Sequence, residues 1–248
     1  RQVEVDICGL QAKLSARMNP IYLDNQATTP LAPEVLDAML PWLKDGFGNP
    51  HSPHLMGRRA AAAVEVAREQ IAALLPEPGQ VIFTGSATEA INLAMGAARS
   101  REGRDQIVVV DTEHAAVRDT ALWYDTQGFG TTLLPVDPQG LIRLEELEAS
   151  LGPQSALVGA MLVNNEIGVI QPVERIAEMA HRAGALMLCD EVQGFGRIDI
   201  PQQADLVALS GHKIYGPKGI GALWVRDGID VPPLIHGGGQ EQGIRSGT

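Results

Sequence analysis

The hydrophobic residues of this chain form short apolar runs that alternate with amphipathic segments. The apolar runs have the length of buried β-strands, and they cover residues 81–84, 107–110, 131–136, 156–163, 185–190, 205–210 and 220–226. Helical periodicity lies between several of them, at 87–99, 115–127, 144–151 and 173–183, and an alanine-rich amphipathic helix is predicted over 55–75. Strands that alternate with helices predict an α/β fold, with a mostly parallel, mixed sheet and helices on both of its faces.

The polar residues with the most distinctive chemistry directly follow these predicted strands. In open α/β sheets, ligands bind outside the carboxyl ends of the strands. We therefore expect the side chains that follow five of the strands to converge on one edge of the sheet. The segments concerned are 85–89, 111–114, 164–166, 190–193 and 210–213.

Two of these strand ends carry a lysine and an acid. Lys213 follows the strand at 205–210, and Asp190 ends the strand at 185–190. Such a lysine can form a Schiff base with an aldehyde cofactor, and such an acid can face the ring nitrogen of pyridoxal phosphate (PLP). The pair predicts a PLP site, although a lysine before a loop is more often a solvated charge, and an aspartate there commonly caps a loop. A phosphate-binding P-loop is excluded, because Pro217 stands where its lysine is required.

The segment 85–89 is the candidate site for the cofactor's phosphate. Ser86 and Glu89 have the spacing of a helix capping box, so a well-started helix is the alternative interpretation. Gly85 would leave room for an anion at the helix N-terminus, where free N–H groups and the helix dipole favour negative charge. The further candidate donors to this phosphate are Thr88, Ser210 and His212.

Three more polar residues are candidates for contacts with the cofactor ring. His114 can stack on the ring and move protons, whereas a lone histidine at a strand end is more often structural. Asn165 and Gln193 can hydrogen-bond the phenolic oxygen of the cofactor, whereas amides in loops usually serve turn geometry.

Composition narrows the class of protein further. The 248 residues are 45% hydrophobic, enough for one large α/β domain or slightly more. The formal net charge of −11 argues against nucleic acid or an anionic membrane as the main partner. No apolar run approaches the roughly 18 residues of a membrane span, and the N-terminus lacks the pattern of a secretion signal, so a cytoplasmic location is expected. The two cysteines, Cys8 and Cys189, cannot build a disulfide framework; Cys189 is expected to be core packing, and no metal site is expected.

In this order, the motifs resemble those of the NifS/IscS-like cysteine desulfurases, within the class V aminotransferase family of fold-type I PLP enzymes. The similarity runs from about residue 21 to the last residue. The segments that carry it are 22–30 (YLDNQATTP), 48–52 (GNPHS), 83–92, 113–114 (EH), 163–168 (VNNEIG), 190–193 (DEVQ), 210–221 and 245–248 (RSGT).

The resemblance implies a homodimeric enzyme that converts L-cysteine to L-alanine and passes the sulfur, as a persulfide, to an acceptor protein for iron–sulfur cluster or thiolation pathways. Lys213 would carry the cofactor as a Schiff base, and His114 would be the acid and base above the ring. The residues implied to bind the cofactor are Ala87, Thr88, His114, Asn165, Asp190, Gln193, Ser210, His212, Lys213 and Thr248, the last of which would reach the phosphate in the other subunit. Two alternatives stay open: another class V enzyme, such as an aminotransferase or selenocysteine lyase, and a truncated, non-catalytic PLP-binding chain.

The chain also departs from the pattern of that family. The family usually reads Thr-Ser-Gly-Ala-Thr where residues 84–88 read Thr-Gly-Ser-Ala-Thr, and it usually has alanine at Glu191 and lysine at Ala115. Its nucleophilic cysteine lies in a C-terminal region after the Arg-Ser-Gly-Thr motif, and neither Cys8 nor Cys189 occupies that place. We therefore expect residues 18–248 to be the PLP-binding large domain of a longer enzyme without its C-terminal small domain, and residues 1–17 to be an extension, native or introduced.

Overall fold

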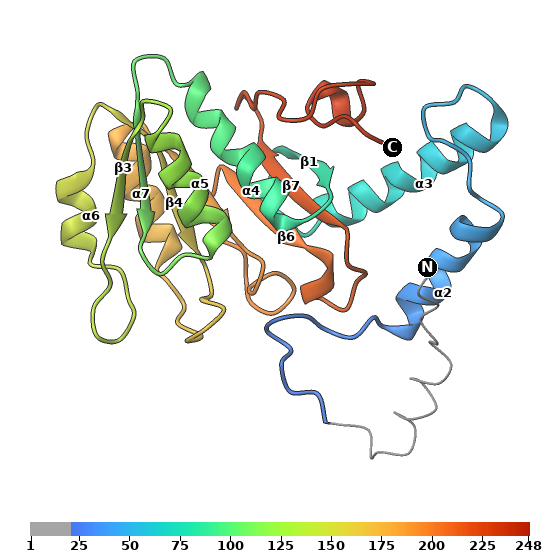
Figure 1. Ribbon diagram of the computed structural model, residues 1–248, viewed down its shortest axis with the longest axis horizontal. Helices are drawn as coiled ribbons and strands as arrows, with labels where there is room; N and C mark the ends of the chain where they lie inside the picture. Colours follow the sequence, from blue (N-terminus) through green and yellow to red (C-terminus); the bar gives the residue numbers. More distant parts are fainter. Residues whose placement is uncertain (1–20) are drawn as a thin grey trace, which may run out of the picture.

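A mixed sheet of seven strands forms the centre of the described part of the chain. The computed structural model describes residues 21–248 (Figure 1), so Cys8 and the predicted extension over residues 1–17 lie outside the described residues. The strand order is β1-β7-β6-β5-β4-β2-β3; β7 runs antiparallel to β1 and β6, and all other neighbours are parallel. The strands are β1 (Gly79–Thr84), β2 (Gln106–Val110), β3 (Gly130–Leu134), β4 (Ser155–Met161), β5 (Leu186–Asp190), β6 (Leu206–Ser210) and β7 (Gly221–Arg226). The predicted mostly parallel, mixed sheet is confirmed.

The strand β4 ends two residues earlier than predicted, at Met161 instead of residue 163. Leu162 donates its N–H to the carbonyl of Asp190 at 3.0 Å, and Val163 then pairs with Ile170 in an isolated antiparallel bridge. The chain therefore leaves the ladder inside the apolar run and folds back on itself, which places Asn165 at the edge of a cavity.

Helices cover both faces of the sheet and enclose two hydrophobic clusters. The helices α4 (Ala87–Gly96) and α5 (Ala115–Asp125) pack on one face, and α6 (Leu144–Ser150) and α7 (Val173–Ala183) pack on the other (Figure 1). Side chains alternate between the two faces along a strand. On β5, Leu188 accordingly joins the α4–α5 cluster, whereas Cys189 joins the α6–α7 cluster. Burial on both faces explains why the strands read as continuous apolar runs.

Local capping signals decide where several helices begin and end. Ser86 starts α4, because its Oγ accepts the N–H of Glu89 at 3.2 Å. Gly184 ends α7 in the left-handed conformation, with a φ of 76°. The helix predicted over 87–99 is split, since α4 ends at Gly96 and Ala97–Ser100 continues as the 3-10 helix η1.

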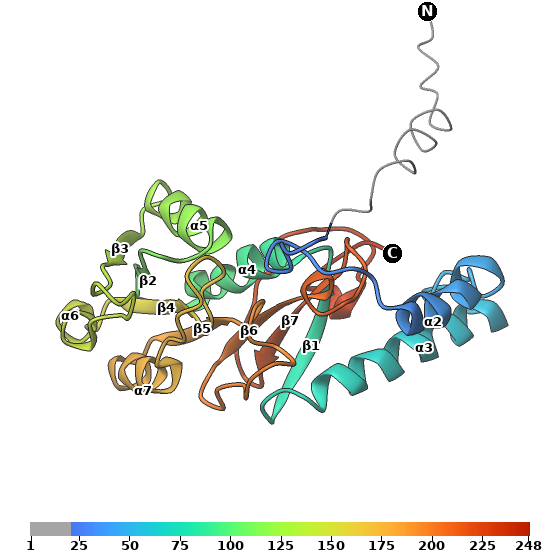
Figure 2. The same ribbon diagram turned by 90° about the horizontal axis from the view of Figure 1, so that it is seen from below.

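Two helices extend beyond the β1 edge of the sheet instead of covering one of its faces (Figures 1 and 2). The predicted alanine-rich helix is α3 (Leu55–Ala72), and Ile71 and Ala72 in its last turn pack against the core. The helix α2 (Pro33–Lys44) is absent from the sequence prediction, because Pro41 interrupts its pattern and none of its residues is buried. Among residues 21–248, no helix is long and apolar enough to cross a membrane.

Candidate active site

The strand ends converge on a cavity of about 250 Å³ at the carboxyl edge of the sheet. Its other walls come from the N-termini of α4 and α5 and from apolar side chains such as Ile91, Met161 and Val163. The cavity is lined by every predicted site residue except Thr248, namely Ala87, Thr88, His114, Asn165, Asp190, Gln193, Ser210, His212 and Lys213.

Lys213 lines this cavity from the 3-10 helix η2 (Gly211–Lys213), which directly follows β6. Its Nζ donates to the main-chain carbonyl of Gln26, and Arg197 donates to the main-chain carbonyl of Lys213 at 2.8 Å. Burial lowers the pKa of Lys213, and the charge of Asp190 partly opposes that shift. A larger share of the amine is therefore neutral and nucleophilic at neutral pH.

Asp190 is the buried acid of the cavity, with 6% of its surface exposed. Its Oδ1 accepts the N–H of Val192 at 2.9 Å. Burial raises the pKa of Asp190, while that hydrogen bond and the nearby His114 and Lys213 favour the ionised form. A buried carboxylate with so few donors needs a cationic partner, and a protonated pyridine nitrogen is one.

The N-terminus of α4 contributes unpaired hydrogen-bond donors. The N–H of Gly85 donates to Glu89 Oε2 at 2.8 Å, and the N–H of Glu89 donates to Ser86 Oγ. The N–H groups of Ala87 and Thr88 donate to no group in the described part of the chain. Two free N–H groups at the positive end of the helix dipole suit a phosphate. The candidate hydroxyl donors beside them are those of Thr88 and Ser210.

His114 combines a structural role with a place in the cavity. Its Nδ1 accepts the N–H of Ala116 at 3.0 Å and so caps α5. The proton of the neutral imidazole therefore lies on Nε2. Both interpretations of this residue are compatible, because the ring that caps α5 also lines the cavity.

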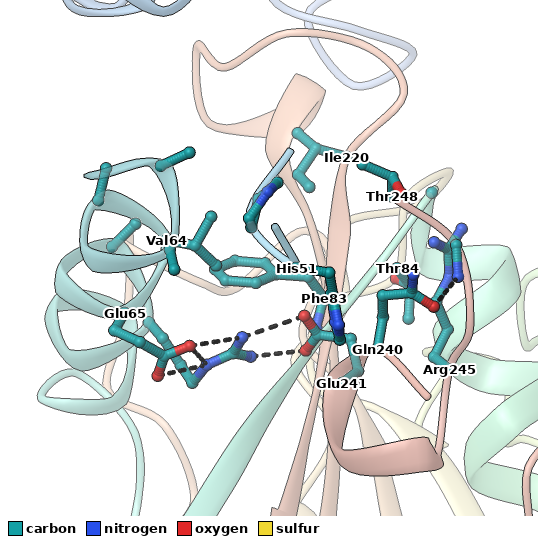
Figure 3. Close-up of a pocket in the computed structure, with 18 of the residues that line it drawn as sticks. His51, Val64, Glu65, Phe83, Thr84, Ile220, Gln240, Glu241, Arg245 and Thr248 are labelled. Carbon is teal, nitrogen blue, oxygen red and sulfur yellow. Dashed lines mark hydrogen bonds and ion pairs between the residues drawn. The ribbon is translucent and has the colours of Figure 1, made fainter. Parts of the chain in front are cut away.

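Thr248 lies outside this cavity. It lines a larger groove of about 860 Å³ between α3, β1 and the C-terminal segment, as Figure 3 shows. The turn before α4 separates the two spaces, since Thr84 and Gly85 line the groove whereas Ser86 and Ala87 line the cavity. The expectation that Thr248 serves a second subunit stays a prediction.

A segment near the start of the described chain holds the lysine turn in place, and sequence reasoning assigned it no role. Thr29 donates its N–H and its hydroxyl to the carbonyl of His212, both at 2.9 Å, and its Oγ1 accepts the N–H of Tyr215. The Oγ1 of Thr28 lies 3.1 Å from Nδ1 of His212. These bonds stabilise Tyr215 in the left-handed region, at a φ of 64°. The family resemblance over residues 22–30 was its sole sequence signal.

Two further buried acids lie next to the cavity. Glu113 Oε1 accepts the N–H of Met161 at 2.8 Å, and Glu191 Oε1 accepts the thiol of Cys189 at 3.2 Å. The second oxygen of each carboxyl has no partner among the described residues. Burial, together with the charge of Asp190, raises the pKa of Glu113 to about 8 and that of Glu191 to about 8. Both side chains are therefore largely neutral at neutral pH.

Cys189 is core packing, as expected, and has no exposed surface. Burial, reinforced by the nearby acids, raises the pKa of its thiol well above the ordinary value. Among residues 21–248, no group of three or more His, Cys, Asp or Glu side chains is arranged to hold a metal ion.

The donor set of the cavity fits pyridoxal phosphate. Lys213 matches the aldehyde, Asp190 matches the ring nitrogen, and the unpaired N–H groups of Ala87 and Thr88 match the phosphate. Lys213 follows β6, and Asp190 ends β5, which lies beside β6 in the sheet. A mostly parallel sheet that carries these two groups defines the fold-type I, PLP-dependent class.

Comparison with known families agrees with this class. The family described as Aminotransferase class-V matches residues 21–246, and the chain belongs to that family, whose enzymes use pyridoxal phosphate. The resemblance stated from the sequence is thereby confirmed.

Among individual relatives, the chain is 48% identical over 238 residues to the cysteine desulfurase IscS of Rickettsia africae, which is 92% of this chain and 58% of that protein. It is 44% identical over 248 residues to the cysteine desulfurase of Mus musculus, covering 96% of this chain and 54% of the relative. The solved structure of a NifS-like protein superposes with a TM-score of 0.88 at 39% identity, over 93% of this chain and 65% of that one. The chain thus spans under two thirds of the length of these relatives.

Proposed function

We propose that this chain is the cofactor-binding part of a PLP-dependent cysteine desulfurase, which converts L-cysteine to L-alanine and passes on persulfide sulfur. The observation that carries the proposal is the single cavity that Lys213, the buried Asp190 and the free N–H groups of α4 share. Relatives named cysteine desulfurases support the reaction. A solved structure described as SspA in complex with cysteine, 40% identical with a TM-score of 0.87, supports the substrate.

The residues of the cavity would divide into those that hold the cofactor and those that serve its chemistry. When bound, pyridoxal phosphate supplies an electron sink for negative charge at the substrate α-carbon. Asp190 would face the ring nitrogen and keep it protonated, because an ionised carboxylate stabilises a cation in a buried site. The remaining contacts would come from Ala87, Thr88, Ser210 and His212 to the phosphate, and from Asn165 and Gln193 to the phenolic oxygen.

Two side chains would act directly on the substrate. The amine of Lys213 would accept a proton from the substrate α-carbon, and the lowered pKa of Lys213 favours the neutral form that this step needs. His114 would present the N–H of Nε2 as a hydrogen-bond donor, because its Nδ1 accepts the N–H of Ala116. The hydrogen bond at Nδ1 also fixes the plane of the ring, which would orient it over the cofactor.

The persulfide would form on a thiol other than Cys189. That thiol is fully buried, donates to Glu191, and lies on the opposite face of β5 from the cavity. Residues 21–248 contain no second cysteine. The described residues thus offer the groups that bind and deprotonate an amino acid, whereas attack on its sulfur needs a thiolate from elsewhere.

Three further points belong to the same proposal. Residues 18–248 would be the large domain, and the exposed apolar side chains of Trp42, Leu43 and Phe47 support pairing with a second copy as a homodimer. A sulfur-acceptor protein in an iron–sulfur cluster or thiolation pathway would be the partner.

The cytoplasmic location stays a prediction, since a relative from Arthroderma benhamiae, 47% identical over 48% of its length, is named a mitochondrial cysteine desulfurase.

Exchange of the substrate α-proton in D₂O, followed by NMR, tests the proposal. We expect the PLP-loaded chain to exchange the α-proton of L-cysteine and L-alanine, and Lys213→Ala to exchange neither. Arg143→Gln, at an exposed position away from the cavity, is the matched control and should equal the parent. Binding of PLP without any exchange would identify the non-catalytic alternative, and accumulation of a keto acid would identify an aminotransferase.

A further inference from the structure

An ion pair lies directly behind the proposed phosphate site. Arg245 Nε donates to Glu89 Oε1 at 2.6 Å, and its Nη2 donates to Oε2 at 3.3 Å. Glu89 lies in the first turn of α4, where its Oε2 also accepts the N–H of Gly85 at 2.8 Å. The carboxylate of Glu89 therefore connects the C-terminal segment with the turn that leads into α4.

Glycine at position 85 allows this contact. A Cβ built on Gly85 would lie 2.9 Å from Glu89 Oε2, so a larger residue would push the carboxylate away. The order Gly85-Ser86 also places a serine at the N-cap, where its Oγ accepts the N–H of Glu89. The N–H groups of Gly85 and Glu89 are thus satisfied within the turn, whereas those of Ala87 and Thr88 have no acceptor among the described residues and can bind an anion.

The segment that carries Arg245 is held in a strained conformation by a second ion pair. Glu241 and Gln242 both have left-handed backbone angles, with φ of 47° and 57°. Glu241 accepts two hydrogen bonds from Arg68, at 2.6 and 3.0 Å (Figure 3). It accepts a third from the N–H of Phe83 at 2.9 Å. Such strain persists only where surrounding contacts over-determine it. The guanidinium of Arg245 is thereby presented from a fixed loop.

We propose that Arg245 is a positioning residue for the phosphate site, and that it acts by neutralising Glu89. The inference rests on the proposed function. Burial alone would raise the pKa of Glu89. The hydrogen bonds from Arg245 and Gly85 outweigh this effect and hold the pKa of Glu89 below its ordinary value, so the side chain is ionised. An uncompensated carboxylate in the first turn of α4 would repel a phosphate at the N–H groups of Ala87 and Thr88. Arg245 removes that repulsion and leaves Glu89 able to hold Gly85.

The test compares a cofactor that carries the phosphate with one that lacks it. Dissociation constants of pyridoxal phosphate and of pyridoxal are measured by absorbance for the parent chain, Arg245→Gln, Glu89→Gln and the double variant. We expect Arg245→Gln to weaken the binding of pyridoxal phosphate about tenfold, because the uncompensated charge of Glu89 would repel the phosphate. The dissociation constant of pyridoxal should change by less than about twofold. We expect Glu89→Gln and the double variant to bind pyridoxal phosphate within about threefold of the parent, because no carboxylate is left to neutralise.

The outcomes separate this inference from a merely structural role and from the proposed function. The neutralising role would be overturned if Arg245→Gln lowered the affinities for pyridoxal phosphate and pyridoxal equally. It would also be overturned if the double variant bound pyridoxal phosphate as weakly as Arg245→Gln does. If Arg245→Gln does not fold, Glu89→Gln still tests the proposal. A tenfold loss of affinity for pyridoxal phosphate in Glu89→Gln would show that the ion pair has a purely structural role, and it would contradict the proposal. Arg143→Gln, which breaks an exposed pair with Glu146, is the control. Failure of the parent chain itself to bind pyridoxal phosphate would instead refute the proposed function.

Discussion

Cys189 and Asp190 are adjacent on β5 and face opposite sides of the sheet. Asp190 lines the cavity that Lys213 shares, whereas Cys189 packs in the hydrophobic cluster beneath α6 and α7. Strand geometry imposes this separation, because successive side chains point to opposite faces. A shift of one position along β5 therefore separates the carboxylate of Asp190, which would bind the cofactor, from the thiol of Cys189, which cannot reach it.

The thiol of Cys189 should be inert in the native protein. In a Cys8→Ser background, where Cys189 is the remaining cysteine, we expect no reaction with a thiol reagent until urea unfolds the chain. Cys189→Ser should leave α-proton exchange unchanged and cost about 1 kcal/mol of stability. Rapid labelling of the folded protein, or loss of exchange in Cys189→Ser, would contradict this assignment.

Lys213 should be the residue that captures the cofactor covalently. We expect the protein loaded with pyridoxal phosphate to absorb in the visible range, and borohydride reduction to fix the cofactor on the peptide that contains Lys213. Lys213→Ala should lose both signals and keep the parental melting temperature, because Lys213 contributes no side chain to the two hydrophobic clusters. The exposed Lys218 provides the control, and a reduced adduct on Lys218 would refute the assignment.

Asp190→Asn should impair the chemistry more than the capture of the cofactor. A neutral amide cannot hold the ring nitrogen protonated, whereas the free N–H groups of α4 still bind the phosphate. Loss of an ionic hydrogen bond is worth about 1.5–3 kcal/mol, which corresponds to a roughly 10- to 150-fold slower α-proton exchange. The dissociation constant of pyridoxal phosphate should change by far less. Exchange at the parental rate would show that Asp190 is not the partner of the ring nitrogen.

The stability of the protein should fall as the pH rises from about 5 to about 8. Burial raises the pKa of Glu113 from 4.5 to about 8, so between these values the folded state holds a proton that the unfolded state releases. The stabilisation is complete at pH values below the pKa of Glu113 in the unfolded state, and it is lost as the pH rises to the pKa of Glu113 in the folded state. Glu113→Gln mimics the protonated acid and keeps an acceptor for the N–H of Met161, so its free energy of unfolding in urea should vary less with pH.

The control for this pH dependence is Glu146→Gln, because 41% of the Glu146 side chain is exposed. That variant should reproduce the parental fall in stability. Glu191, whose pKa burial also raises to about 8, should add a second contribution of the same sign. An identical pH profile in the parent and in Glu113→Gln would show that Glu113 is ionised in the folded protein.

Gly221→Ala should destabilise the protein and weaken its affinity for pyridoxal phosphate. A Cβ at Gly221 would lie 2.5 Å from the carbonyl carbon of Ser86 and 2.8 Å from the nitrogen of Ala87. Because both neighbours are backbone atoms at the start of α4, either the helix or β7 must move, at a cost of about 1–3 kcal/mol. Gly152→Ala is the matched control, since a Cβ there meets nothing within 4 Å. Equal melting temperatures for the two variants would disprove the close approach.

Much of the fold and the core of the site follow from local pattern. The strands can be predicted from the sequence because both faces of the sheet are buried, so each strand is a continuous apolar run. The start of α4 is readable because Ser86 and Glu89 form their capping interaction within one turn. Lys213 and Asp190 could be paired in advance, because strands that run parallel bring their carboxyl ends to one edge.

The remaining features depend on contacts between residues far apart in the chain. Thr29 holds the carbonyl of His212 across 183 residues, and Arg245 reaches Glu89 across 156. The antiparallel direction of β7 and the position of α2 beyond the β1 edge likewise carry no local pattern of their own. Hydrophobic periodicity reports which residues are buried, and it does not report which partner they meet. The strand order, the support of the lysine turn and the ion pair behind the phosphate site were therefore decided only when the chain packed, because each depends on hydrogen bonds and charges that meet in the folded protein.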